Sequence, residues 1–198
     1  MQNAVLKDLK HTYNNIASDF SKTRQKVWDF LKEVDFSNSQ TILEVGVGNF
    51  RNLAYLTAKH SFKLAVGLDF AKNFMQFKPQ GIDAVIGDAL TLPFKNDSFH
   101  TSLSIAVIHH FPSKELRLKA LNELWRVTSN FVIVSVWSRE SKKKKTGEKE
   151  ADLKWKGKFS RYYYFYDYDE FKQDMLSVQP SNHKFYNDGD NLWALLYK

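Results

Sequence analysis

The chain has 198 residues, 43% of them hydrophobic and 15% aromatic, and it contains no cysteine. This composition excludes a disordered chain, a disulfide framework and a thiolate metal site. No apolar run approaches the roughly 20 residues that cross a bilayer, and the amino terminus lacks the apolar stretch of a signal peptide. We therefore expect one domain over residues 1–198, located in the cytoplasm or the nucleus, with no metal and no membrane association.

Positive charge is in excess, with a formal net charge of +7. Such a balance favours polyanionic partners. The segment near residues 139–151 is basic and contains a glycine, so a flexible surface loop is predicted there. Two interpretations remain open, a solvated linker or a finger that contacts RNA phosphates and makes binding salt-dependent. The lysines of this segment that are candidates for RNA binding are Lys142, Lys143, Lys144 and Lys145.

The first half of the chain begins with helical patterns and then alternates. Helices are predicted over residues 3–16 and 24–34, the second because its apolar side chains recur three and four residues apart. Short apolar segments bounded by turn residues then predict strands at residues 42–45, 63–69 and 82–88.

The second half continues the alternation and ends in a hairpin. Ser113 caps a predicted helix that extends to about Val127, and the Asp188-Gly189 pair is a hairpin signal. Strands that alternate with helices indicate a Rossmann-like α/β fold. We expect a mostly parallel seven-stranded sheet with helices on both faces and an antiparallel carboxy-terminal hairpin strand. The remaining predicted elements are strands at residues 99–107 and 130–137, a helix at 167–178 and strands at 183–186 and 191–197.

The most informative segment is the turn after the first strand, within residues 41–49. Gly46 and Gly48 permit a tight turn and a close approach of a ligand to the backbone, before a helix that starts near Phe50. A dinucleotide-binding turn would carry a third glycine where Arg51 stands, so a pyrophosphate cradle is disfavoured. With Glu44 before the turn, the pattern suits a ligand that carries an amine and no phosphate, such as S-adenosylmethionine.

Two further carboxylates end the next two strands. Asp69 lies close to the roughly 20-residue spacing at which an acid binds ribose hydroxyls after such a turn. Asp88 can accept a hydrogen bond from the exocyclic amine of an adenine, while the backbone N–H of Ala89 donates to its ring. Ligands of open parallel sheets bind beyond the carboxyl ends of the strands, so we expect Glu44, Asp69 and Asp88 to converge. The alternative for each aspartate alone is a turn former or a loop cap.

Several segments match the signatures of one enzyme family. Residues 13–24 read Tyr-Asn-Asn-Ile-Ala-Ser-Asp-Phe-Ser-Lys-Thr-Arg, and residues 104–110 read Ser-Ile-Ala-Val-Ile-His-His. Residues 158–163 read Lys-Phe-Ser-Arg-Tyr-Tyr, while residues 152–155 and 188–193 resemble the family's Asp-x-x-x-Pro-Trp and Arg-Asp-Asn-Trp-Trp segments. In this order of motifs the chain resembles the class I S-adenosylmethionine-dependent methyltransferases. More narrowly, it resembles the eukaryotic tRNA wobble-uridine (carboxymethyluridine) methyltransferases and the methyltransferase part of the AlkB-type tRNA hydroxylase.

The resemblance implies a reaction and a partner. The enzyme would use S-adenosylmethionine to esterify the carboxylate of 5-carboxymethyluridine at the wobble position of a tRNA anticodon loop. It would work as a heterodimer with a small zinc-binding activator protein that adds to the sheet edge. Because a carboxylate is ionised at neutral pH, the reaction needs no general base and depends on positioning.

The same resemblance assigns residues to the reacting end of the site. It places Arg24 in the active site, where a guanidinium fork suits the acceptor's carboxylate. His110 would hydrogen-bond the uridine or its arm, Tyr13 would cover the methionine carboxylate, and His109 would pack inward. The alternatives are a surface arginine for Arg24 and a core aromatic for Tyr13. The further cofactor-binding residues by motif position are Gly46, Gly48, Asn49 and Ile105.

An aromatic cluster at residues 162–166 follows Arg161. If the segment is extended, alternate residues from Tyr162 form one face, and Tyr163 and Phe165 form the other. One face is expected in the core, and the other beside the substrate. Arg161 and Tyr162 are therefore candidates for binding and stacking an unpaired base.

Departures from the family leave alternatives open. Phe50 and Arg51 replace a glycine and a lysine of the family's turn, and the Phe50 ring either crowds the methionine end of the cofactor or packs inward. One alternative is a methyltransferase of small quinones or carboxylic acids, whose activity would survive ribonuclease. Another is a non-catalytic tRNA-binding adaptor that has lost its cofactor.

Overall fold

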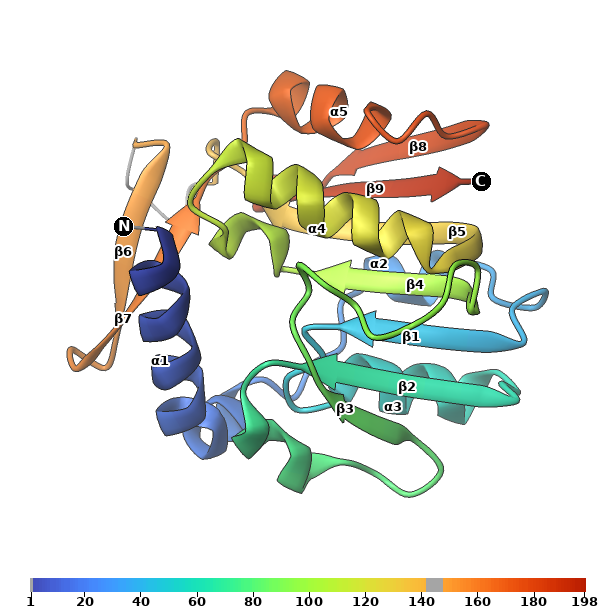
Figure 1. Cartoon of the computed structure of the whole chain (residues 1–198), viewed down its shortest axis with the longest axis horizontal. Helices are drawn as coiled ribbons and strands as arrows, with labels where there is room; N and C mark the ends of the chain where they lie inside the picture. The colour runs from blue at the N-terminus through green and yellow to red at the C-terminus, as the bar shows by residue number, and fades with distance from the viewer. Residues whose placement is uncertain (1, 142–147) are drawn as a thin grey trace.

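The computed structural model describes residues 2–141 and 148–198, with side chains from residue 4. A seven-stranded sheet forms the middle of the molecule (Figure 1). Its strands are β1 (Thr41–Val45), β2 (Leu64–Asp69), β3 (Asp83–Ile86), β4 (Phe99–Ile105), β5 (Thr128–Trp137), β8 (Asn182–Asn187) and β9 (Asn191–Tyr197). Their order across the sheet is β3-β2-β1-β4-β5-β9-β8, and only β9 runs antiparallel to its neighbours. The predicted fold is confirmed.

Helices cover both faces of the sheet. In Figure 1, α4 (Lys114–Arg126) and α5 (Tyr168–Leu176) lie in front, and α2 (Phe30–Glu33) and α3 (Arg51–Lys59) lie behind. The Ser113 hydroxyl accepts the backbone N–H of Leu116, so the predicted cap of α4 is present. Two 3₁₀ turns, η1 (Lys72–Phe77) and η2 (Ile108–His110), follow β2 and β4.

A second, two-stranded sheet was not predicted. Strands β6 (Glu150–Trp155) and β7 (Phe159–Tyr164) form an antiparallel hairpin that stands beside the long helix α1 (Gln2–Thr23). The Thr12 hydroxyl donates to the Ser160 carbonyl at 3.0 Å, and the Trp155 indole donates to the Asp19 carboxylate at 2.7 Å. Figure 1 shows α1 and this hairpin across the end of the main sheet toward which its parallel strands point. Together they cover that end.

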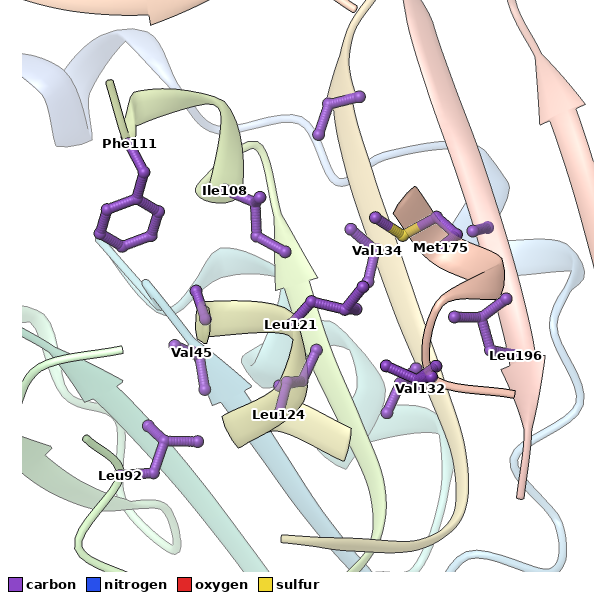
Figure 2. Close-up of a cluster of buried hydrophobic side chains, with 14 of the residues drawn as sticks. Val45, Leu92, Ile108, Phe111, Leu121, Leu124, Val132, Val134, Met175 and Leu196 are labelled. Atoms are coloured by element: carbon purple, nitrogen blue, oxygen red, sulfur yellow. The ribbon is translucent and has the colours of Figure 1, made fainter. Parts of the chain in front are cut away.

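Apolar side chains form a core on each face of the main sheet. Figure 2 shows Leu121 and Leu124 of α4 with Val132 and Val134 of β5 in the cluster beneath α4 and α5. The second cluster includes Leu53 and Leu56 of α3. Both layers consist of closely packed apolar side chains, which hold the sheet's carboxyl edge in a fixed shape.

The helix predicted over residues 24–34 is wrong, because only α2 is helical there. The apolar side chains of this segment are drawn onto β9 instead. The Phe30 ring stacks on the Trp193 ring with centroids 4.7 Å apart, and the Trp28 ring contacts Trp193 edge-on with centroids 5.6 Å apart. The apolar spacing that predicted a helix in this segment therefore serves contacts with β9, and tertiary packing overrides the local helical preference.

Several residues of the basic loop predicted near residues 139–151 are not loop residues or are not exposed in the structure. Glu150 and Ala151 already belong to β6 and pair with β7, and Ser141 is buried. The lysine run itself, residues 142–145, lies outside the described residues.

Candidate active site

A cavity of about 400 Å³ opens at the carboxyl end of the sheet, between the strand ends of the main sheet and the cover formed by α1 and β7. Glu44, Asp69 and Asp88 all line it. The three acids therefore converge as the sequence predicted. Glu44 and Asp69 lie at the carboxyl ends of β1 and β2, and Asp88 follows β3. The three strands are adjacent, so their parallel alignment brings the acids together.

Glu44 is a buried carboxylate with one unused oxygen. It is 1% exposed, and its Oε1 accepts a hydrogen bond from Asn52 at 2.7 Å. Its Oε2 has no hydrogen-bond partner among the described residues. Burial raises the pKa of Glu44 to about 7, with Asn52 acting in the opposite direction. An orphaned acceptor of this kind fits a ligand that brings a cation or a hydrogen-bond donor.

Asp69 shapes the glycine turn and also faces the cavity. Its carboxylate accepts the backbone N–H groups of Gly48 and Ala71, both at 2.9 Å. Burial raises its pKa to about 6 against these hydrogen bonds. Gly46 is required next to it, because a Cβ there would lie 2.3 Å from Val107 Cγ2 at a φ of +73°. Asp69 thus acts as a loop cap, the alternative that the sequence left open, and it also lines the cavity.

Asp88 is more open to solvent. Its Oδ1 accepts the backbone N–H of Leu90 at 2.9 Å. Ala89 lines the cavity beside it, on the β3 side, and Ile105 lines the cavity from the end of β4.

Phe50 does not plug the cavity. Its side chain is fully buried, and its ring lies 2.5 Å from the place that a Cβ on Gly67 would take. The ring therefore packs inward on β2, as one of the two interpretations held, at a residue with a left-handed φ of 63°. The adaptor alternative rested on a Phe50 ring that crowds the cofactor, and this ring points away from the cavity.

The other end of the cavity contains a hydrogen-bonded chain. The Nδ1 atom of His110 lies 2.7 Å from the Tyr162 carbonyl, which can only accept, so Nδ1 carries the proton. Nε2 then accepts the Tyr13 hydroxyl at 2.9 Å. Burial lowers the pKa of His110 to about 3, and it raises the pKa of Tyr13. Both groups are neutral at physiological pH.

Two arginines lie near this end. Arg24 is exposed at the end of α1, and its backbone carbonyl accepts the side-chain amide of Asn49 at 2.8 Å. Arg161 is only 7% exposed, on β7. Both line the cavity, and both guanidinium groups lie close to the Trp155 ring, at 5.5 Å for Arg24 and 4.9 Å for Arg161.

Residues 43–133 match the family model described as a methyltransferase domain. The chain carries a methyltransferase domain. Among solved structures, the methyltransferase resembles a Burkholderia thailandensis N1-methyltransferase with bound S-adenosylhomocysteine. That likeness has a TM-score of 0.74 at 12% identity and covers 100% of this chain and 90% of the other. The likeness shows that the fold is that of class I methyltransferases.

Curated relatives of the methyltransferase carry a more specific name. It is 34% identical over 144 residues to the tRNA (carboxymethyluridine(34)-5-O)-methyltransferase alkbh8 of Xenopus tropicalis, which covers 69% of this chain and 22% of the relative. It is 30% identical to the enzyme of that name from Schizosaccharomyces pombe, over 70% of this chain and 60% of the relative. The chain thus spans between a fifth and three fifths of these two relatives.

A further structural likeness involves a complex. The methyltransferase resembles the structure titled as the complex between the Haloferax volcanii Trm112 methyltransferase activator and the putative methyltransferase. The TM-score is 0.73 at 13% identity, with 96% of each chain covered.

The methyltransferase's aromatic cluster differs from the prediction. Tyr163 lines the cavity, because it shares a face of β7 with Arg161. Tyr162, on the other face, is partly buried against the core and is not among the residues that line the cavity, so its stacking role stays a prediction. Tyr164 and Tyr166 are buried too, so no exposed aromatic face remains.

Other predicted and unpredicted positions complete the site of the methyltransferase. His109 packs inward as expected, and its Nδ1 accepts the backbone N–H of Trp137 at 3.0 Å. Sequence reasoning missed Asn52, although its place in the first turn of α3, eight residues after Glu44, was a usable signal. Within residues 2–141 and 148–198 we find no metal-ligating cluster and no helix able to span a bilayer.

Proposed function

We propose that this methyltransferase esterifies the carboxylate of 5-carboxymethyluridine at the wobble position of tRNA. Relatives of that name support the proposal, at 30–34% identity over about 70% of the chain. S-adenosylmethionine supplies an electrophilic methyl group, and the acceptor's own carboxylate is the nucleophile.

The observation that carries the proposal is that His110 and Tyr13, the hydrogen-bonded pair described at the acceptor end, are both poor general bases. Both ring nitrogens of His110 are already engaged, and its pKa of about 3 keeps the imidazole weakly basic. Tyr13 donates its proton to His110, and its raised pKa keeps it protonated. An acceptor that arrives ionised needs no base, and a carboxylate does so at neutral pH.

The cofactor-facing residues fit the groups of S-adenosylmethionine. The unpaired Oε2 of Glu44 would accept the methionine amine. Asp69 would bind the ribose hydroxyls, and Asp88 with the Ala89 backbone would bind the adenine. Gly46 and Gly48 keep the turn free of side chains that would fill this space. These residues bind and orient, so positioning supplies most of the rate.

Mass spectrometry of wobble nucleosides tests the proposal. The protein is incubated with S-adenosylmethionine and tRNA that carries free carboxymethyluridine, and the methyl ester is the expected product. Absence of the ester from soluble protein that binds the cofactor would contradict the proposal. Methylation of small acids that persists after ribonuclease treatment would identify the small-molecule alternative.

We further propose that a small zinc-binding activator protein pairs with a sheet edge of this chain. The Haloferax complex supports an activator of this kind. Strand β3 is one edge of the sheet, and its last residue, Ile86, is 57% exposed. An apolar side chain on an open edge favours covering by a partner. We expect poor solubility or low activity without the activator; full solubility and activity of the chain alone would refute this.

A further inference from the structure

Arg161 is a buried cation without an anion. It is 7% exposed, and its Nε has no hydrogen-bond partner among the residues that the structure describes. No carboxylate of the described residues forms an ion pair with it. Burying a charge is unfavourable unless an opposite charge or several hydrogen bonds compensate. A folded protein that retains such a group in a cavity wall is therefore arranged to receive an anion there.

The surroundings of Arg161 hold its guanidinium without neutralising it. The Trp155 ring lies 4.9 Å away and the Tyr163 ring 5.3 Å away, so the group is held between aromatic faces. Its positive charge contributes to the low pKa of His110 and acts on the Tyr13 hydroxyl. Both groups stay uncharged, so they leave the positive charge of Arg161 without a neutralising partner.

Arg24 is placed differently. Its side chain is exposed, with its guanidinium 5.7 Å from Phe20 and 5.5 Å from Trp155. Its backbone is tied to Asn49 of the glycine turn, which is the cofactor side of the cavity. Water therefore already solvates the charge of Arg24, and a ligand relieves little by pairing with it.

We propose that Arg161, in place of Arg24, binds the carboxylate of the methyl acceptor, an assignment that rests on the proposed function. A guanidinium presents two parallel N–H donors to a carboxylate, which fixes the acceptor's orientation. An uncharged acceptor of the same shape would leave the buried charge unpaired. Arg161 therefore selects an ionised acid over its amide, and in this way sets the chemical class of the acceptor.

Equilibrium binding tests this selection without turnover. The chain, with its activator if that is the soluble form, is saturated with S-adenosylhomocysteine. It is titrated with anticodon stem-loop RNA whose wobble uridine carries either a carboxymethyl or a carbamoylmethyl group. We expect the wild type to prefer the acid by roughly 100-fold, and Arg161→Gln to reduce this preference below about tenfold. Arg161→Lys keeps the charge without the fork and should bind the acid about tenfold more weakly.

Arg24→Gln is the matched control and should keep the preference for the acid. A role of Arg161 in folding alone would lower the melting temperature of Arg161→Gln, whereas removal of an unpaired buried charge should not. Unchanged affinity for the acid in either position-161 variant overturns the proposal. Methyl-ester formation by the wild type is measured in parallel. If the wild type prefers the acid but forms no ester, the proposed function fails while the role of Arg161 stands.

Discussion

At the residue scale, two buried carboxylates determine how the cofactor site responds to pH. Burial raises the pKa of Glu44 to about 7 and that of Asp69 to about 6. In the proposed site, Glu44 and Asp69 bind the cofactor most strongly as ionised carboxylates. We therefore expect protonation between pH 8 and pH 5.5 to weaken the binding of S-adenosylmethionine.

We predict that cofactor affinity falls as the pH decreases through 7. With a pKa near 7, about a tenth of Glu44 is ionised at pH 6, so affinity should drop about tenfold between pH 8 and pH 6. Calorimetric titration with S-adenosylhomocysteine across this range measures it. Glu44→Gln should bind weakly at every pH and lose most of this dependence above pH 6.5. A flat profile for the wild type would exclude the ionised Glu44 from cofactor binding.

The stability of the cofactor-free protein should rise as the pH decreases, whereas its affinity for the cofactor should fall. The pKa of Glu44 is higher in the folded state, about 7, than its usual 4.5, so only the folded state keeps the proton between these values. Stability is therefore lost as the pH rises through this window. We predict that Glu44→Gln raises the free energy of unfolding by about 1–3 kcal/mol at pH 8 and changes it little at pH 4.5. Denaturant melts of the cofactor-free protein at both pH values measure this; destabilisation at pH 8 would contradict it.

At the element scale, the contact between the α3 start and β2 depends on one pair of residues. The Phe50 ring fills the space above Gly67, where a Cβ would lie 2.5 Å from the ring and 2.8 Å from Val47. We predict that Phe50→Gly costs about 3 kcal/mol or more, since the lost core packing exceeds the strain of roughly 1 kcal/mol relieved at its positive φ. Gly67→Ala should cost less in the Phe50→Gly background than in the wild type. A double-mutant cycle by chemical denaturation gives the coupling, and additive costs would disprove the contact's importance.

The same scale shows what the sequence could predict. Most of the main-sheet strands were predictable, because they are apolar runs that end in a turn signal, and the acids followed from their places at the ends of these runs. The polar edge strand β8 was predictable from the Asp188-Gly189 hairpin signal instead. Helix α1 continues seven residues beyond its predicted end at residue 16, because Ile16 and Ala17 remain buried against the molecule.

What the sequence could not show depends on distant packing. The segment at residues 24–34 loses its helix to contacts with Trp193, far along the chain. The β6–β7 hairpin is polar on one side and aromatic on the other, without the continuous apolar run that marks a central strand. The lack of an ion pair for Arg161 is a tertiary property that no local pattern encodes.

At the scale of the whole molecule, the two sheet edges differ in character. Edge β3 ends in exposed Ile86, whereas edge β8 carries Lys184 and a Tyr186 ring that already stacks on Phe30 at 6.0 Å. Charged side chains protect an edge from pairing, so β3 is the better docking edge.

We predict that Ile86→Glu weakens co-purification with the activator more than tenfold, because it places a charge in an apolar contact. Its effect on the folding stability of the chain should stay within about 0.5 kcal/mol, since the side chain is exposed. Tyr186→Glu, on the opposite edge, is the control and should still co-purify. If Tyr186→Glu abolished co-purification and Ile86→Glu did not, the activator would bind the β8 edge and the prediction would be wrong.

The segments that cover the carboxyl end of the sheet come from outside residues 43–133, the part that matches the methyltransferase family model. Helix α1 brings Tyr13, and the β6–β7 hairpin brings Arg161 and Tyr163. The glycine turn and the three acids thus lie within the matched residues, whereas Arg161, the proposed acceptor-binding residue, lies outside them. Exchange of the hairpin during evolution would then alter the choice of acceptor while the turn and the acids stay in place.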